Sequence, residues 1–127
     1  MSNETILIVD DEERILQLIK DILFTEGYDV ITAASGKEAI KKSRKCIPDL
    51  IVMDIMMPDL DGAEAVKLLK EDHATRNIPI LFLSGIIMKE SGKAEQDIKV
   101  GGEFYSALPK PFGAEELLTA VHKLLEN

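Results

Sequence analysis

Short apolar runs that do not alternate with polar residues recur along the chain. Ile6–Val9, Leu50–Met53 and Ile80–Leu83 are uninterrupted, as is typical of strands buried on both faces of a parallel sheet. Two further segments, Tyr28–Ala34 and Glu103–Leu108, are more mixed, which is typical of edge strands or less covered strands. The pattern therefore predicts five strands.

Segments with the apolar spacing of helices separate these runs. After the first run, Ile15, Ile19 and Ile22 recur at intervals of three or four residues. Comparable spacing occurs over residues 39–43, 63–69 and 117–125. Repeated strand–helix units connected by right-handed crossovers predict an α/β fold, with helices on both faces of an open sheet. We expect a doubly wound, flavodoxin-like, five-stranded parallel sheet with strand order 2-1-3-4-5.

The fourth helix has the weakest pattern. Met88–Val100 is compatible with a helix, but Ser91-Gly92 interrupts it and Gly101-Gly102 follows it. Glycine inside a helix costs about 1 kcal/mol relative to alanine. We therefore predict a short and loosely held helix here.

Three helix starts have the spacing of a capping box, in which an N-cap oxygen and a carboxylate three residues later bind exposed amides. The pairs are Asp10 with Glu13, Ser35 with Glu38, and Asp61 with Glu64. Taken alone, Asp10 is therefore interpreted first as a helix cap.

Length and charge narrow the class of protein. The 127 residues are expected to form a single domain over residues 1–127. A net charge of −8 argues against direct nucleic-acid binding, which needs clustered basic residues. Cys46 is the only cysteine, and neither a secretory signal nor a membrane-spanning run is present, so we expect a cytoplasmic protein without membrane association.

Polar residues follow the predicted strands at one edge of the sheet. Asp10 and Asp11 follow the first strand, Asp54 the third, Ser84 the fourth and Lys110 the fifth. Ligands of open α/β sheets bind at this edge, near the point where the strand order reverses. Because the first and third strands are neighbours in the expected order, the three carboxylates should lie close together.

This crowding of carboxylates indicates a metal site. Two carboxylates about 5 Å apart repel each other by roughly 3 kcal/mol at an effective dielectric of about 20. Either one of them is protonated or a cation lies among them, and Mg²⁺ fits best because it needs few carboxylates and keeps several waters. Carboxylates, a metal, an ammonium group and a hydroxyl together suit phosphoryl transfer.

These motifs resemble the receiver domain of two-component response regulators over essentially the whole chain. The matching segments are Asp10-Asp11, Asp54-Ile-Met-Met-Pro58-Asp-Leu-Asp61-Gly62, Ser84-Gly85 and Lys110-Pro111-Phe112. The resemblance implies that Asp54 accepts a phosphoryl group from a histidine of a partner kinase. It also implies that Lys110 and Ser84 contact the phosphoryl oxygens and that a cis peptide bond precedes Pro111.

The same resemblance implies the ligands of the metal. Asp11, Asp54 and the backbone carbonyl of Met56 would bind Mg²⁺ directly, and Asp10 would act through water. Receivers usually carry an aromatic switch residue three positions before the lysine, where this chain has Ala107. Tyr105 lies two residues earlier on the same strand face, and both assignments stay open.

The resemblance implies a sensor histidine kinase or phosphotransfer protein as one partner and a downstream target or output domain as another. A weak homodimer and membership of a longer protein both stay open. A competing hypothesis is a receiver-like interaction module that works without phosphorylation. An aspartyl-phosphate phosphohydrolase is disfavoured, because such enzymes carry a second aspartate where this chain has Met56.

Overall fold

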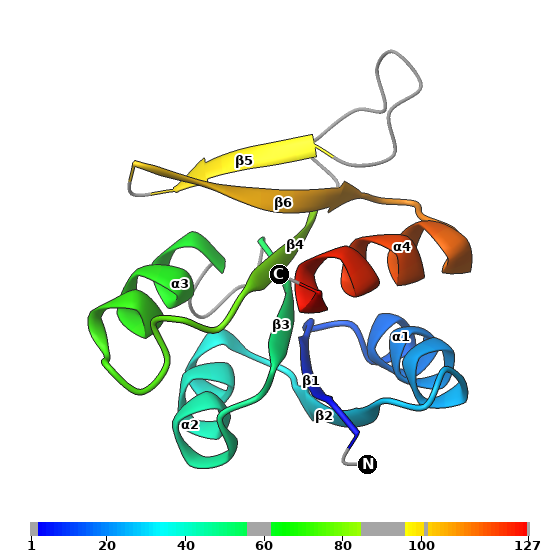
Figure 1. The fold of residues 1–127 in the computed structure, drawn as a ribbon, viewed down its shortest axis with the longest axis horizontal. Helices are drawn as coiled ribbons and strands as arrows, with labels where there is room; N and C mark the ends of the chain where they lie inside the picture. Colours follow the sequence, from blue (N-terminus) through cyan, green and yellow to red (C-terminus); the bar gives the residue numbers. More distant parts are fainter. Residues whose placement is uncertain (1–2, 56–61, 85–95, 101, 127) are drawn as a thin grey trace.

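Strands and helices alternate along most of the computed structural model, which describes residues 3–55, 62–84, 96–100 and 102–126 (Figure 1). In chain order the elements are β1 (Thr5–Val9), α1 (Glu13–Thr25), β2 (Asp29–Ala33), α2 (Gly36–Cys46), β3 (Leu50–Asp54), α3 (Gly62–Glu71), β4 (Ile80–Ser84), β5 (Gln96–Val100), β6 (Glu103–Pro109) and α4 (Ala114–Leu125). The five strands predicted from the apolar runs are all present, with ends that differ by at most one residue.

The strands form one sheet in the order β2-β1-β3-β4-β6-β5. All neighbouring strands are parallel except β5, which is antiparallel to β6. With β6 counted as the fifth parallel strand, the predicted order 2-1-3-4-5 is confirmed. The central pairing aligns Val9 of β1 with Met53 of β3, so the residues that follow these two strands emerge side by side.

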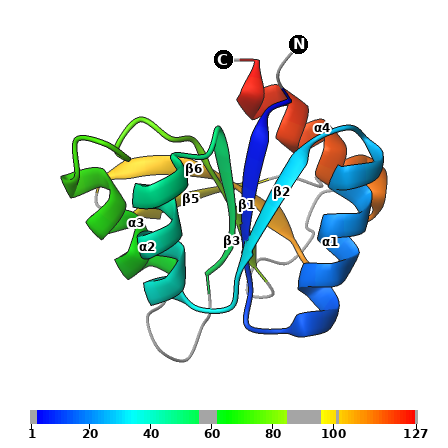
Figure 2. The same cartoon turned by 90° about the horizontal axis from the view of Figure 1, so that it is seen from below.

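Two apolar layers cover the sheet, because successive side chains of a strand point to opposite faces. Leu7 and Met53 belong to a cluster with α2 and α3, whereas Ile8 and Val52 pack with α1 and α4. Figure 2 shows these helix pairs on opposite sides of the strands. The predicted doubly wound arrangement is confirmed. No helix in the described part of the chain is long and apolar enough to span a bilayer.

Of the predicted capping boxes, the one at the start of α2 is seen in part, because Ser35 is the N-cap residue but Glu38 binds the amide of Ala34, one residue before it. The Ser35 hydroxyl accepts a hydrogen bond from the Glu38 amide at 3.2 Å, and the Glu38 carboxylate accepts one from the Ala34 amide at 2.6 Å. The predicted Asp10 cap is wrong: the N-cap residue of α1 is Glu12, and Asp10 instead accepts from the Glu12 amide at 2.9 Å. Asp61 lies outside the described residues.

The predicted helix over Met88–Val100 is wrong for its last five residues, which form β5 in a hairpin with β6. Residues 85–95 lie outside the described part. Two residues, Gly101-Gly102, connect β5 to β6, and Gly102 has a φ of +88°. A two-residue glycine link between short strands favours a tight hairpin, because its turn needs positive φ. Gly102, whose φ is positive, therefore suits the turn of a strand pair.

Candidate functional site

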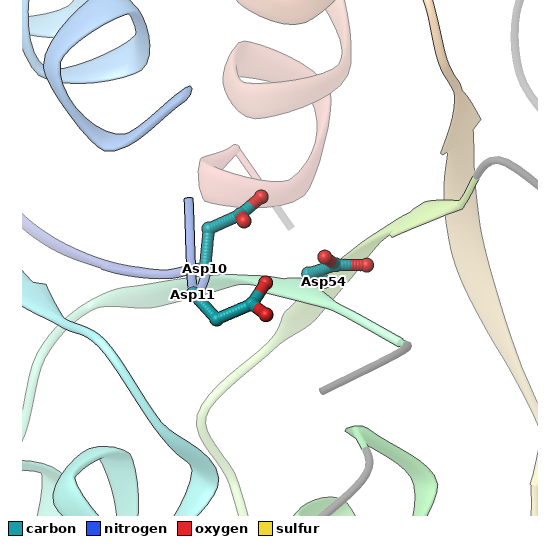
Figure 3. A group of neighbouring side chains, drawn as sticks. All are labelled: Asp10, Asp11 and Asp54. Atoms are coloured by element: carbon teal, nitrogen blue, oxygen red, sulfur yellow. The ribbon is translucent and has the colours of Figure 1, made fainter. Parts of the chain in front are cut away.

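Three carboxylates meet where β1 and β3 end. Asp10 and Asp11 follow β1, Asp54 is the last residue of β3, and one oxygen of each lies within 4.8 Å of the others (Figure 3). The parallel pairing of β1 with β3 places these strand ends at the same edge. The sequence predicted this convergence, and the structure brings all three residues together.

The carboxylates differ in their access to solvent. Asp10 is completely buried and Asp54 is only 6% exposed, whereas Asp11 is exposed. A buried carboxylate loses its hydration and must be compensated by hydrogen bonds or by a cation. Asp10 and Asp54 therefore form a buried, negatively charged floor of the site. The side with Asp11 is open to solvent, so an ion or a phosphoryl donor can approach there.

Lys110 supplies a cation to the buried carboxylates. Its ammonium lies 3.3 Å from an oxygen of Asp10 and 3.3 Å from an oxygen of Asp54. The Lys110 amide donates to the carbonyl of Ser84 at 2.9 Å, and the Lys110–Pro111 peptide bond is cis, as expected from the sequence. The hydrogen bond to the Ser84 carbonyl fixes the start of the Lys110 side chain beside the acidic cluster.

The pKa shifts of Asp10 and Lys110 show how burial and the neighbouring charges balance in the site. Burial is the main cause that raises the pKa of Asp10, and the charge of Asp54 adds to it, while the Glu12 amide and Lys110 act in the opposite direction. For Lys110, burial lowers the pKa, but the charges of Asp10 and Asp54 outweigh it and the net shift is upward. Lys110 is therefore charged at neutral pH, but its charge does not fully offset the cost of burying Asp10.

The other predicted site residues lie one strand further along the sheet or outside the described part. Ser84 ends β4, is 1% exposed, and pairs in register with Pro109, which precedes Lys110. Asp54 pairs with Leu83, so Ser84 lies one residue beyond it at the same edge. Met56, the predicted carbonyl ligand, lies outside the described residues.

Gly62 was not assigned a role from the sequence, although it touches the backbone of Asp54. A Cβ atom at this position would lie 2.8 Å from the Asp54 carbonyl oxygen, 2.8 Å from the Ile55 Cα and 3.2 Å from the Phe82 ring. The Gly62 amide also donates to the Ile55 carbonyl at 2.8 Å. The start of α3 thus packs directly against the end of β3, and only glycine fits between them.

The structure describes both candidates for the aromatic switch position. Ala107 is fully buried and pairs with Phe82, whereas Tyr105 packs edge-to-face on Phe82 with ring centroids 5.8 Å apart. The Tyr105 hydroxyl donates to Glu103 at 2.9 Å, and burial together with this carboxylate raises the pKa of Tyr105 to about 12. Both residues contact the same apolar cluster, so the predicted shared face is confirmed.

The spacing of the oxygens suits Mg²⁺. An octahedral ion with ligand distances of about 2 Å holds its oxygens within roughly 4 Å of one another. A spread of up to 4.8 Å therefore fits two direct carboxylate ligands and a third carboxylate that acts through water. The uncompensated charge shown by the raised pKa of Asp10 favours a cation in the same place.

We expect Asp10→Asn to stabilise the metal-free protein at neutral pH. The folded-state pKa of Asp10 lies above its unfolded value of 3.8, so its contribution to stability is fully present below that value and is lost as the pH rises through the folded-state pKa. The variant should therefore unfold at a higher temperature than wild type at pH 7 in a chelating buffer. The difference should shrink in acid. A lower melting temperature at pH 7 would show that the Lys110 pair outweighs the cost of burial.

Comparisons with known proteins agree on one family. The sequence model of one protein family, the response regulator receiver domain, matches residues 6–122 of the chain. The chain is 41% identical to the alkaline phosphatase synthesis transcriptional regulatory protein PhoP of Bacillus subtilis, over 98% of the chain and 50% of that protein. It is 34% identical to the polar-differentiation response regulator DivK of Brucella ovis, over 96% of each. The chain thus spans about half the length of PhoP and nearly all of DivK.

Solved structures agree with the fold. Chemotaxis protein CheY4 of Vibrio cholerae is 35% identical with a TM-score of 0.82, over 97% of this chain and 99% of that one. The receiver domain of sensor histidine kinase PA1611 of Pseudomonas aeruginosa, which has a magnesium ion coordinated in its active site cleft, is 25% identical with a TM-score of 0.85, over 99% of this chain and 100% of that one. With its doubly wound sheet, its three clustered aspartates and these matches, the chain belongs to the receiver domain family of two-component response regulators.

Proposed function

We propose that residues 1–127 act as one receiver domain in which Asp54 accepts a phosphoryl group. The donor is a phosphohistidine on a sensor histidine kinase or a phosphotransfer protein. The observation that carries the proposal is the convergence of Asp10, Asp11 and Asp54 within 4.8 Å, with the Lys110 ammonium 3.3 Å from both buried carboxylates. The phosphorylated domain then signals to a downstream protein or an output domain.

The chemistry needs one nucleophile and no base from this chain. A carboxylate oxygen of Asp54 attacks phosphorus and forms a P–O bond, while the P–N bond to the donor imidazole breaks. The electron pair of the P–N bond returns to the imidazole nitrogen, and a proton on the other ring nitrogen keeps the leaving group neutral. The later loss of the phosphoryl group to water is a self-directed reaction, and no outside substrate is processed.

The residues present fit a divalent metal. Asp11 and Asp54 would hold Mg²⁺ directly together with the carbonyl of Met56, and Asp10 would orient a bound water. When bound, Mg²⁺ neutralises the carboxylates and the incoming phosphoryl oxygens. The magnesium in the cleft of the PA1611 receiver domain supports this assignment.

Lys110 and Ser84 would convert phosphorylation into a change of conformation. A phosphoryl group adds nearly two negative charges and three acceptor oxygens beside the Lys110 ammonium. The Lys110 amide is bonded to the Ser84 carbonyl, so the two residues are coupled through the backbone. Any conformation that brings their side chains closer to the new oxygens gains population in proportion to the added contact energy.

The direct test is incubation with acetyl phosphate and Mg²⁺. The expected result is a mass increase of one phosphoryl group that maps to the peptide containing Asp54 and disappears when a chelator is added first. Beryllofluoride should shift NMR signals near Asp54 under the same conditions. Absence of both reactions would favour the interaction module that works without phosphorylation.

Lys110→Ala is expected to keep Mg²⁺ binding and to lose the conformational response. Removing one partner of a buried ion pair costs about 3–5 kcal/mol when burial is complete. The Lys110 side chain is 21% exposed, so we expect a loss of about 2 kcal/mol without metal and partial recovery with Mg²⁺. Thermal unfolding, titration calorimetry and beryllofluoride-induced NMR shifts measure these effects, with the exposed Lys41→Ala as control. Unchanged beryllofluoride shifts away from the site would remove Lys110 from the switch.

A further inference from the structure

Phe82 contacts both the start of α3, beside Asp54, and Tyr105. Its side chain is fully buried and belongs to the apolar cluster on the side of α2 and α3. A Cβ atom at Gly62 would lie 3.2 Å from the Phe82 ring and 2.8 Å from the carbonyl oxygen of Asp54. The Phe82 ring therefore packs against α3 where this helix meets the backbone of Asp54. The same ring is in edge-to-face contact with Tyr105, with an interplanar angle of 89°.

The small side chain of Ala107 gives Phe82 access to Tyr105. Phe82 pairs in register with Ala107, and both residues belong to the same apolar cluster. Tyr105 lies two residues before Ala107 on β6, so it is a diagonal neighbour of Phe82 on the same face. Diagonal neighbours on one face of a sheet are within reach of aromatic side chains. A large side chain at position 107 would compete for the space in which the two rings meet.

Tyr105 lies among polar and charged groups, so a small displacement of its ring is measurable. Its hydroxyl donates a hydrogen bond to the Glu103 carboxylate at 2.9 Å. The Lys70 ammonium lies 5.6 Å from the centroid of the Tyr105 ring. That ammonium also donates to the backbone carbonyls of Arg76 and Ile78, at 2.7 and 3.2 Å. A shift of the Tyr105 ring therefore changes its distance to a cation that the backbone holds in place.

We infer that Phe82 is a positioning residue that transmits the state of Asp54 to Tyr105. This inference rests on the proposed function, because it needs Asp54 to accept a phosphoryl group. The Gly62 amide donates to the Ile55 carbonyl at 2.8 Å, so the start of α3 follows the backbone that adjoins Asp54. Close-packed interiors transmit small shifts, since little free volume absorbs them. Displacement of the end of β3 therefore moves Gly62 against the Phe82 ring, and the ring changes its contact with Tyr105.

This route differs from the one that receivers usually have. Their aromatic switch residue comes three positions before the lysine, where this chain has Ala107. In this chain the aromatic ring paired with that position comes from β4, and it contacts α3 as well as β6. Phe82 thus connects the end of β3 to the outer strands without a movement of the side chain at position 107.

Tyrosine fluorescence in a Tyr28→Phe background tests this inference. The chain contains two tyrosines and no tryptophan, so the emission then comes from Tyr105 alone. The exchange keeps the ring at position 28, which contacts the His122 ring with centroids 5.9 Å apart. Beryllofluoride with Mg²⁺ should produce a saturable change in Tyr105 emission. The change should follow the occupancy of the site, which fluorine NMR of the bound beryllofluoride measures independently.

Phe82→Leu in the same background should keep beryllofluoride binding and lose the change in Tyr105 emission. Leucine stays apolar and fills part of the same volume, but it has no ring to contact Tyr105. Leu81→Val is the matched control, because Leu81 is the preceding residue of β4, is also fully buried and belongs to the cluster on the opposite face. Leu81→Val should lower the melting temperature and keep the response of Tyr105.

The outcomes separate this inference from the proposed function. Beryllofluoride that binds without any change in Tyr105 emission would overturn the inference and leave the proposed function intact. An undiminished change in Phe82→Leu, or loss of the change in Leu81→Val as well, would also overturn it, because the Phe82 ring would then not be the specific link. Beryllofluoride that does not bind at all would overturn the proposed function, and this inference with it.

Discussion

Asp54→Asn is expected to abolish uptake of a phosphoryl group from acetyl phosphate. The amide has no charged oxygen that can attack phosphorus, and Asp10 and Asp11 belong to a different strand end with Asp10 completely buried. Intact-mass analysis after incubation with acetyl phosphate and Mg²⁺ should show only the unmodified variant. The exposed Asp21→Asn on α1 is the matched control and should be phosphorylated as wild type.

The same variant tests the charge balance of the site. Asp54→Asn removes one carboxylate that raises the pKa of Asp10, while Lys110 keeps its contact with Asp10. We therefore expect the melting temperature in metal-free buffer to be equal to or slightly above that of wild type. Phosphorylation of the variant at full rate would assign the acceptor to another residue. A clear loss of stability would contradict the repulsion inferred among the carboxylates.

Gly62→Ala is expected to destabilise the fold strongly and to disturb Asp54. The added Cβ would lie 2.8 Å from two backbone atoms of residues 54 and 55, which cannot move as easily as a flexible side chain. Overpacking of this kind costs about 1–3 kcal/mol or more. A melting temperature lower by roughly 3–6 °C for each kcal/mol is expected for a chain of this size. Phosphorylation by acetyl phosphate should slow, because the end of β3 must shift.

Gly113→Ala provides the matched control for this prediction. A Cβ atom at Gly113 would meet only the Glu116 carboxylate, at the ordinary contact distance of 3.6 Å. Its backbone is extended, with a φ of −91°, so alanine adopts it without strain. We expect a change of less than about 1 kcal/mol at this helix N-cap. A Gly62→Ala variant as stable as Gly113→Ala would show that α3 can move away from β3 without cost.

The strands were predictable because their apolar runs are local features of the sequence, and the acidic edge was predictable from the expected strand order. In uninterrupted apolar runs such as Ile6–Val9 and Ile80–Leu83, side chains on both faces of the strand must be buried. A strand in the centre of a covered sheet meets this requirement. Once the strand order is set, the residues that follow β1 and β3 must meet at one edge. The convergence of Asp11 with Asp54 is thus a consequence of parallel pairing and not of any local signal at either residue.

The hairpin of β5 and β6 was missed although the sequence contained a signal for it. Gly101-Gly102 was interpreted as a helix-weakening pair, whereas its position between two short strands also suits a tight turn. The choice between helix and strand for residues 96–100 depends on pairing with β6, which is a tertiary contact. Such contacts override local preference in short segments.

The detailed contacts of the site depend on how the ends of strands and helices pack together. The spacing of residues along the sequence does not determine these distances. The interpretation of Asp10 as a helix cap came from the spacing to Glu13, but the buried carboxylate is bound by the Glu12 amide and Lys110 instead. The close approach of Gly62 to the Asp54 backbone is likewise a contact between the ends of two elements. Neither contact leaves a periodic pattern in the sequence.

A crystal structure of the chain with Mg²⁺ and beryllofluoride would test the central claim most directly, namely that the clustered carboxylates hold a divalent ion and prime Asp54. We predict the ion between Asp11 and Asp54, and the beryllofluoride group on an oxygen of Asp54 within hydrogen-bond distance of the Lys110 ammonium. Mg²⁺ bound away from these two carboxylates, or beryllofluoride attached to another residue, would contradict the claim.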